Sequence, residues 1–381
     1  MAYHPTLRTC LWIKLADLLL QQKISNVFII LLVDITEKEG KPPLCTITDI
    51  FFGWAIDIAK FYNWVTKLHH FFRMADGTDP WSRFMQPQIS MSLGSYGMLC
   101  NTVEEVGPQA LEWLRKYTKI PVWTVGPLLP PAFLKKLSSS VQSSNHKQHS
   151  GKLHGISLEM CVEWLDLQYP DSVLYISFGS QNTISPSQMM ELAIGLEESE
   201  IRFIWVIRPP TGFDFRVEFT AEWLPEGFEE RVKKSKQGLL VRNWAPQLEI
   251  LSHKSTGAFL SHCGWNSVMK SLSQGVLLIG WAMAGEEAFN SKMLVEEMGV
   301  SVELTRGLQN IVGKEVKEVI ILAMSKTQKG EEMKQNAAKI RKQIRASVME
   351  EGEAKGSSIK VLDDFVRSIV SRRLREISLL K

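Results

Sequence analysis

The sequence predicts an α/β protein built on parallel, doubly wound β-sheet. In the second half of the chain, apolar runs of strand length alternate with segments of helical periodicity, at 173–178, 187–198 and 202–207. Such alternation is typical of parallel βαβ units with helices on both faces of the sheet. A length of 381 residues, with 45% hydrophobic and 22% charged residues, fits a globular protein of two domains.

The first half of the chain has shorter and less regular elements. Helical spacing of apolar residues predicts a helix over 11–22, whereas short apolar runs predict strands. The expected strands are Val27–Val33, Leu44–Asp49 and Met98–Thr102, and a second helix is expected over Ala110–Lys116.

A polar segment without periodicity divides the chain. Residues 137–155 are rich in Ser, Gln, His and Lys, which predicts a flexible linker. We therefore expect a first domain at 1–136 and a second domain, with the doubly wound sheet, at 156–358. A C-terminal helix is expected at 359–381, with one apolar face. That face is formed by Val361, Leu362, Phe365, Val366 and Ile369.

Charge and cysteine content exclude several classes of protein. The 44 basic and 41 acidic residues leave a formal charge of only +3, which gives no general attraction for nucleic acid. The longest apolar run near the start, Val27–Val33, is too short for a transmembrane segment. Five scattered cysteines without a C-x-x-C pair favour a reducing compartment. We expect a cytoplasmic monomer that binds no nucleic acid and has no transmembrane segment.

The segment Phe259–Ser267 predicts a phosphate site. An apolar strand runs into the small-residue turn His262-Cys263-Gly264, and a helix is expected to start at Asn266-Ser267. Such a start directs backbone N–H groups and the positive end of the helix dipole at one point. His262, Asn266 and Ser267 add side-chain donors, although Asn266 and Ser267 are equally compatible with a capping role.

Residues on either side of this turn extend the pattern. Trp244 offers a flat face for a base, and Gln247 offers an amide for a sugar hydroxyl. Downstream, Glu286 and Glu287 offer acceptors for sugar hydroxyls. A core tryptophan and a loop amide are the alternatives for Trp244 and Gln247. Taken together, the segment predicts contacts for a base, a ribose, a diphosphate and a sugar.

The segment from Trp244 to Asn290 resembles the signature box of the plant family 1 UDP-glycosyltransferases. Its W-A-P-Q opening, H-C-G-W-N-S centre and closing acidic pair follow the family's order and spacing. Further similar segments extend the resemblance to about 43–373; they are Val125–Pro127, Val173–Ser180, Leu224–Phe228 and Gly356–Ser358. The resemblance implies a GT-B fold of two Rossmann-like domains, with the C-terminal helix packed back across both. It also implies a UDP-sugar donor, a small hydroxylated acceptor, and no metal or other cofactor.

The resemblance assigns a role to each residue of the box. Trp244 stacks on uracil while the backbone of Ala245 reads the base edge, and Gln247 bonds the ribose. His262 and Ser180 meet the diphosphate. Trp265 lies against the sugar. The expected UDP-sugar-binding residues are Ser180, Trp244, Ala245, Gln247, His262, Trp265, Asn266, Ser267, Lys270, Glu286 and Glu287.

Other ligand classes fit less well. A metal site at His253, His262 and Cys263 has no common zinc spacing. Neither G-x-G-x-x-G nor G-x-x-x-x-G-K-[ST] occurs in the chain, which argues against a dinucleotide oxidoreductase and a P-loop protein.

Two positions of the box depart from the family. Lys270 stands where the family has the glutamate that binds the ribose, and an ammonium group has no lone pair to offer a hydroxyl. An approach of Lys270 to the phosphates would offset part of that loss. Glu287 stands where the family has glutamine, which can donate as well as accept.

The catalytic pair of the family is only partly matched. Asp49 matches the carboxylate that orients the family's general-base histidine, but the histidine position falls near Thr9. We therefore expect a shortened first domain, with His4 either as the base or as a frayed terminal residue. Two functions stay open. One is an inverting glucosyltransferase acting on a hydroxyl of a small plant metabolite. The other is a catalytically silent nucleotide-sugar-binding remnant that lacks the base.

Overall fold

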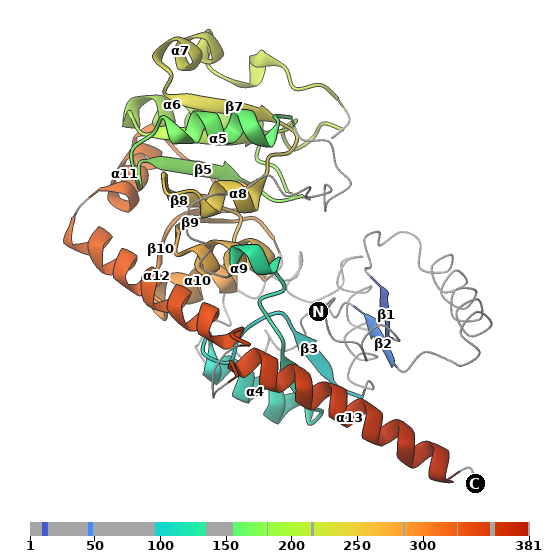
Figure 1. The fold of residues 1–381 in the computed structure, drawn as a ribbon. Coiled ribbons are helices and arrows are strands. Elements are labelled where there is room, and N and C mark those ends of the chain that lie inside the picture. The colour runs from blue at the N-terminus through green and yellow to red at the C-terminus, as the bar shows by residue number, and fades with distance from the viewer. Residues whose placement is uncertain are drawn as a thin grey trace. The chain divides into compact units, whose positions relative to one another are not determined.

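The computed structural model describes residues 10–13, 45–48, 96–134, 155–180, 182–214, 217–284, 286–325, 327–350 and 355–379. These residues belong to two compact units, whose helices and strands are labelled in Figure 1. The described residues of the larger unit lie within Leu129–Ala346. The smaller takes its described residues from Met1–Ile58, Asp76–Leu128 and Ser347–Lys381.

The larger unit is built on a six-stranded sheet in which every strand pairs in parallel with its neighbours. The spatial order is β10-β9-β8-β5-β6-β7, so the direction in which successive strands are added reverses between β5 and β8. This is the arrangement of a doubly wound sheet. The strands are β5 (Val173–Ser177), β6 (Arg202–Ile207), β7 (Gly238–Arg242), β8 (Thr256–Ser261), β9 (Leu277–Ala282) and β10 (Ser301–Arg306).

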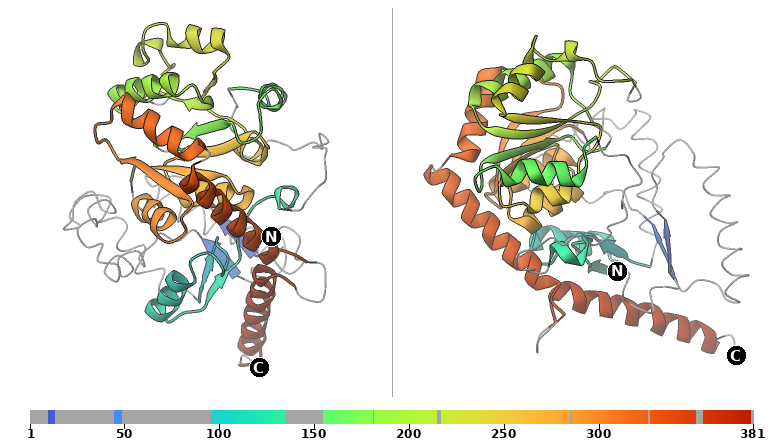
Figure 2. Two further views of the ribbon diagram at one scale, coloured as in Figure 1. Left: turned by 90° about the vertical axis from the view of Figure 1, so that its left-hand side faces the viewer. Right: turned by 45° about the horizontal axis from the view of Figure 1, so that its top comes forward.

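The central strands are apolar because both faces of the sheet are covered. Every residue of β5, β8 and β9 is buried, as expected of parallel strands between two layers of helices. Aromatic side chains join neighbouring strands, with Tyr175 stacked on Phe259 at 4.9 Å between ring centroids. The two views in Figure 2 show helices on both sides of this sheet.

Two groups of helices cover the sheet. Helix α6 packs against α11, while α8 packs against both α5 and α9. Gly195 permits the close approach of α6 and α11, because a Cβ at this position would lie 2.5 Å from the Cβ of Val316. The described α-helices of the larger unit are α5 (Leu158–Asp166), α6 (Pro186–Ser199), α7 (Phe228–Ser235), α8 (Gln247–Ser252), α9 (Trp265–Gln274), α10 (Glu287–Glu296), α11 (Gly313–Met324) and α12 (Gln328–Ser347).

Within the described residues, the smaller unit contains two short parallel strand pairs and two α-helices. β1 (Cys10–Ile13) pairs with β2 (Cys45–Thr48), and β3 (Met98–Cys100) pairs with β4 (Val122–Thr124). Helix α4 (Pro108–Thr118) lies between β3 and β4 in the chain.

The long helix α13 (Ser357–Leu379) packs its apolar face on β4. Trp123 lies edge-on to Phe365 at 5.1 Å between ring centroids, and its Nε1 donates to Asp364 Oδ2 at 3.0 Å. The predicted apolar face of the C-terminal helix is therefore confirmed, because Phe365, Val366 and Ile369 are all buried.

Most of the predicted elements in the described residues are confirmed, including all three elements of 173–207 and the helix around 110–116. The helix predicted over 11–22 is wrong at Leu11–Ile13, which belongs to β1. An apolar run this short is compatible with either type of element, and pairing with β2 decides for a strand. The rest of that helix, the strand at 27–33 and all but the last residue of the 137–155 linker lie outside the described residues.

None of the helices in the described ranges combines the length and apolar character needed to cross a bilayer.

Candidate functional site

The candidate site lies where the strand order reverses. β5 and β8 are neighbours, and Ser177 and Ser261 at their ends are paired in register. Both strands therefore deliver their following loops to the same edge of the sheet. β5 leads through Gly179 and Ser180 towards α6, and β8 leads through His262 to α9. Ligands of open α/β sheets bind in the crevice at this kind of switch point.

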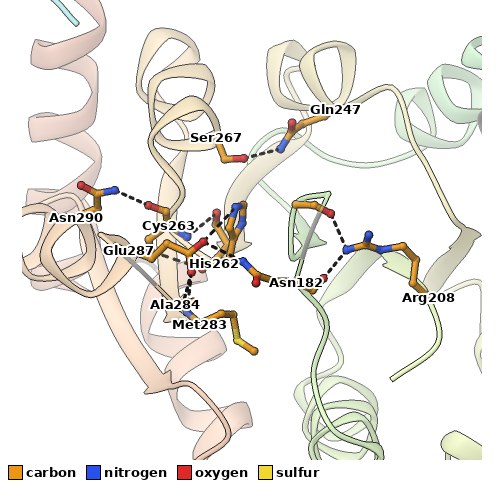
Figure 3. A network of polar contacts seen from close by, with 12 residues as sticks. Asn182, Arg208, Gln247, His262, Cys263, Ser267, Met283, Ala284, Glu287 and Asn290 are labelled. Carbon is orange, nitrogen blue, oxygen red and sulfur yellow. Dashed lines mark hydrogen bonds and ion pairs between the residues drawn. The ribbon is translucent and has the colours of Figure 1, made fainter. Parts of the chain in front are cut away.

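The imidazole of His262 is buried between two glycines of these loops. A Cβ at Gly179 would lie 2.6 Å from His262 Nε2, and a Cβ at Gly264 would lie 2.5 Å from the same atom. Gly179 also has a φ of +73°, a conformation that side chains disfavour. Both positions therefore need glycine, and the ring is held in one place. Figure 3 shows His262 at the centre of the polar network around it.

The turn after His262 is locked by two side chains. Cys263 has a φ of +63°, which is unusual for a residue other than glycine. Its N–H donates to Ser261 Oγ at 3.1 Å, and its carbonyl oxygen accepts from Asn290 Nδ2 at 2.9 Å. Burial raises the pKa of the Cys263 thiol to about 12, so the thiol stays protonated and is not a nucleophile.

Glu287 closes the turn between β9 and α10. Its Oε2 accepts from the backbone N–H groups of Met283 and Ala284, each at 2.8 Å. Its Oε1 accepts from Asn182 Nδ2 at 2.9 Å, which ties the loop after β5 to this turn (Figure 3). Glu286 is the residue before the first turn of α10 and is half-buried. Burial raises the pKa of both carboxyls, that of Glu287 to about 8.

His262 and Glu287 form a neutral pair at neutral pH. Their Nε2 and Oε1 atoms are 3.8 Å apart, a distance that would make an ion pair if both groups were charged. Burial, with a contribution from the positive charge of Arg208, lowers the pKa of His262 to about 4. Between about pH 4 and pH 8 the imidazole is therefore uncharged and the carboxyl is largely protonated. The Nδ1 atom of His262 has no hydrogen-bond partner in the described part of the chain.

Helix α9 begins one residue earlier than predicted. Its first residue is Trp265, and Gly264 takes the capping position without a side-chain bond. The Gly264 carbonyl accepts from the N–H groups of Ser267 and Val268 at 2.9 and 3.1 Å. The capping alternative for Asn266 and Ser267 is therefore wrong, because extended backbone at Gly264 starts the helix before them. Both residues lie in the first turn, with Asn266 exposed, Ser267 buried and Trp265 half-buried.

Three of the predicted binding residues contact one another. Gln247 is the first residue of α8, and its Nε2 donates to Ser267 Oγ at 3.4 Å. Lys270 Nζ donates to Gln247 Oε1 at 2.9 Å. The Lys270 ammonium is thus directed at the amide oxygen that was expected to serve the ribose.

Trp244 and Ala245 lie between β7 and α8 and are both half-buried. The guanidinium carbon of Arg208 lies 5.6 Å from the centroid of the Trp244 ring. Ser180 is exposed, and its carbonyl oxygen accepts from Arg208 Nη1 at 3.0 Å. Arg208 therefore lies next to both Trp244 and Ser180.

Sequence reasoning missed Asn182, Arg208 and Asn290. Arg208 directly follows β6, so its position at the end of an apolar strand was an available signal. Asn182 and Asn290 had no such signal, because their partners are Glu287 and a backbone carbonyl far along the chain.

The expected catalytic residues His4 and Asp49 lie outside the described residues. β2 ends at Thr48, immediately before Asp49. Their roles, like the binding roles of the residues above, stay predictions. Within the described ranges, no group of three or more His, Cys, Asp or Glu side chains is placed to hold a metal ion.

Acid should destabilise the protein through His262. The unfolded imidazole has a pKa of 6.5 and the folded one about 4, so its contribution is fully present above pH 6.5 and is lost as pH falls through 4. The contribution is about 3 kcal/mol, or roughly 6–12 °C in Tm for a unit of this size. Calorimetric scans at pH 7 and pH 4 should show a larger fall for the parent than for His262→Asn. Parallel falls would show that His262 is not buried in its neutral form.

Comparison with known proteins places these residues in a family. Residues 158–339 match the family described as "UDP-glucoronosyl and UDP-glucosyl transferase". The chain is 42% identical over 311 residues to UDP-glycosyltransferase 92A1 of Arabidopsis thaliana, covering 81% of this chain and 60% of that protein. It is 34% identical over 281 residues to UDP-glycosyltransferase 73C4 of Solanum lycopersicum, covering 71% of this chain and 77% of that protein. The chain thus spans less than two thirds of the Arabidopsis protein.

Solved structures agree with the sequence comparison. UGT2 of Phytolacca americana, solved in complex with UDP-2fluoro-glucose and pterostilbene, is similar with a TM-score of 0.63 and 27% identity. The similarity covers 88% of this chain and 72% of that one. The predicted α/β fold of GT-B type is confirmed by such neighbours. The chain belongs to the plant family 1 UDP-glycosyltransferases.

Proposed function

We propose that this chain binds a UDP-sugar and transfers the sugar, with inversion, to a hydroxyl group of a small plant metabolite. The observation that carries the proposal is the meeting of two strand-to-helix loops at the switch point, with His262 clamped between Gly179 and Gly264. The Phytolacca relative, solved with UDP-2fluoro-glucose and pterostilbene, supports a glucosyl donor and a small-molecule acceptor. Residues 156–358 would bind the donor and residues 1–136 the acceptor.

The hydrogen-bond donors that the site offers to the diphosphate are uncharged and fixed in place. The neutral imidazole of His262 can donate one N–H, and the start of α9 adds the positive end of its dipole. Arg208 supplies a full positive charge nearby. These groups stabilise the negative charge that develops on the leaving UDP, so we propose that no metal is required.

The transfer step needs one base. The acceptor oxygen forms its bond to the anomeric carbon as the bond from that carbon to the phosphate oxygen breaks, and UDP leaves with the electron pair. The acceptor proton passes to a general base, for which we propose His4 oriented by Asp49. We further propose that the protein acts as a monomer in the cytoplasm, a setting consistent with the free cysteines Cys100, Cys161 and Cys263.

One contact favours a second candidate function, a nucleotide-sugar-binding protein without transfer activity. Lys270 Nζ donates to the amide oxygen of Gln247, which competes with a ribose hydroxyl for that oxygen. Position 270 also lacks the carboxylate that the family resemblance implies for ribose binding. Both features weaken the ribose contacts. The predictions below separate the two candidates.

UDP should bind without metal. Calorimetric titration of the full chain with UDP in the presence of EDTA should give a measurable heat, because all the proposed phosphate donors belong to the chain. ADP serves as the matched control, since it presents the same diphosphate with a larger base. A folded chain that gives no heat with UDP would contradict the proposed function in both of its forms.

Replacing Lys270 with Glu should tighten UDP-glucose binding. The carboxylate would accept from ribose hydroxyls and release Gln247 Oε1, for a gain of about 1–2 kcal/mol or roughly five- to thirtyfold in affinity. Lys270→Met separates the two effects, because it releases Gln247 without adding an acceptor. Lys314→Glu, at an exposed site on α11, controls for the change in net charge. Unchanged or weaker binding by Lys270→Glu would show that residue 270 does not face the ribose.

Transfer activity should be low, because no histidine stands at the family's base position near Thr9. The activity that remains should depend on His4. In assays with UDP-glucose and a panel of flavonols and simple phenols, His4→Ala should reduce turnover about 10²–10⁴-fold and leave UDP affinity unchanged. Asp49→Asn should have a similar effect, because the imidazole would lose its orienting carboxylate. Turnover that resists both changes would place the base elsewhere. UDP binding without any turnover would select the second candidate function.

A further inference from the structure

Arg208 joins several parts of the site, although no role was predicted for it. Its guanidinium donates from Nη2 to the carbonyl oxygen of Gly179 at 2.6 Å and from Nη1 to that of Ser180 at 3.0 Å. Nη2 also donates to the carbonyl oxygen of Asn182. One side chain thus holds three carbonyl groups of the loop between β5 and α6. Figure 3 shows the guanidinium directed at this loop.

The same guanidinium also faces Trp244, with 5.6 Å between the guanidinium carbon and the ring centroid. A planar cation at this distance from an indole is attracted by the ring. Arg208 therefore connects the loop after β5 with the aromatic residue before α8. The two segments are far apart in sequence and contain the residues expected to meet the diphosphate and the base.

Among the residues that the structure describes, Arg208 takes part in no ion pair within 4.0 Å. A guanidinium of this kind keeps its proton in proteins. The cost of its partial burial is instead offset by the three carbonyl bonds, an arrangement for which the fork of a guanidinium is suited and an ammonium is not.

The loop is held from its other side by Glu287, which accepts from the side chain of Asn182. Ser185 then ends the loop, because it caps α6 in a reciprocal pair of bonds with Gln188. Arg208 holds the backbone at Gly179 and Ser180, between the end of β5 and these two fixed points.

We propose that Arg208 is a positioning residue for the donor: it fixes the backbone at Gly179, Ser180 and Asn182 in the course that meets the diphosphate. The proposal rests on the proposed function, since it takes the diphosphate of a UDP-sugar as the ligand. Arg208 acts through the loop, with its N–H groups turned to the backbone. The planar geometry of its donors matters in addition to its charge.

The test compares a ligand with phosphates and one without. Dissociation constants for UDP, by calorimetry, and for uridine, by ligand-observed NMR, are measured for the parent, Arg208→Gln and Arg208→Lys. Loss of charge-assisted bonds should weaken UDP binding of Arg208→Gln roughly tenfold to a hundredfold. Arg208→Lys should recover only a small part of this, because a single ammonium nitrogen cannot reproduce the two donor nitrogens of the guanidinium fork. Uridine binding should weaken no more than about threefold in either variant, since loss of one cation–π contact has a small effect.

Arg202 provides the matched control. It lies at the other end of β6 and donates to the backbone carbonyl of Ser235, away from the site. Arg202→Gln should leave both affinities at the parent's values. Arg208→Lys keeps the test decisive if Arg208→Gln does not fold.

Three results would overturn the proposal. Full recovery of UDP affinity in Arg208→Lys would show that Arg208 acts through its charge alone. Equal weakening for UDP and uridine would show a general structural role. A parent chain that binds no UDP would overturn the proposed function itself, and this outcome is separate because it needs no variant.

Discussion

The whole site depends on the reversal of strand order between β5 and β8. Because the two strands are parallel and paired up to Ser177 and Ser261, their chains leave the sheet side by side and then diverge to helices of different layers. Ligands of open α/β sheets bind where strands diverge in this way. Gly179 and Gly264 leave space for the ring of His262, since a Cβ at either position would collide with it. Topology thus brings the two loops together, and two glycines fix the ring of His262 between them.

Burial then determines the charges at this edge of the sheet. His262 is too enclosed to hold a proton at neutral pH, and Glu287 is too enclosed to release one readily. The positive charge next to the loop comes from Arg208, whose burial is offset by backbone carbonyls. The pair that looks like an ion pair by distance is therefore a pair of neutral groups. The site therefore has a fixed cation and an uncharged imidazole at neutral pH.

The sequence predicted the elements whose signal lies in a short run of neighbouring residues. The strands and helix of 173–207 could be predicted because each has an uninterrupted apolar run or a helical period. The junction at His262 could be predicted because a strand, a small-residue turn and a helix follow one another directly. The helix predicted at Leu11 could not be distinguished from a strand, because four apolar residues fit both and the decision rests on pairing with 45–48. The bond from Lys270 to Gln247 depends on how α8 packs against α9, which no local pattern reports. The place of Arg208 at the end of the apolar strand β6 could be read from the sequence, but its bonds could not, since its partners are backbone carbonyls that have no sequence signature.

The bonds of Arg208 to carbonyl oxygens have a consequence for how this site can diverge. A backbone carbonyl is present whatever the residue, so the grip on the loop does not depend on the side chains that the loop displays. Substitutions at Ser180 can therefore alter what the loop presents to a ligand and leave its course unchanged. The structural demand at this end of the loop therefore rests on Arg208 and on Gly179, whose φ of +73° disfavours any side chain, and a substitution at Ser180 would change the ligand contacts of the loop without loosening it.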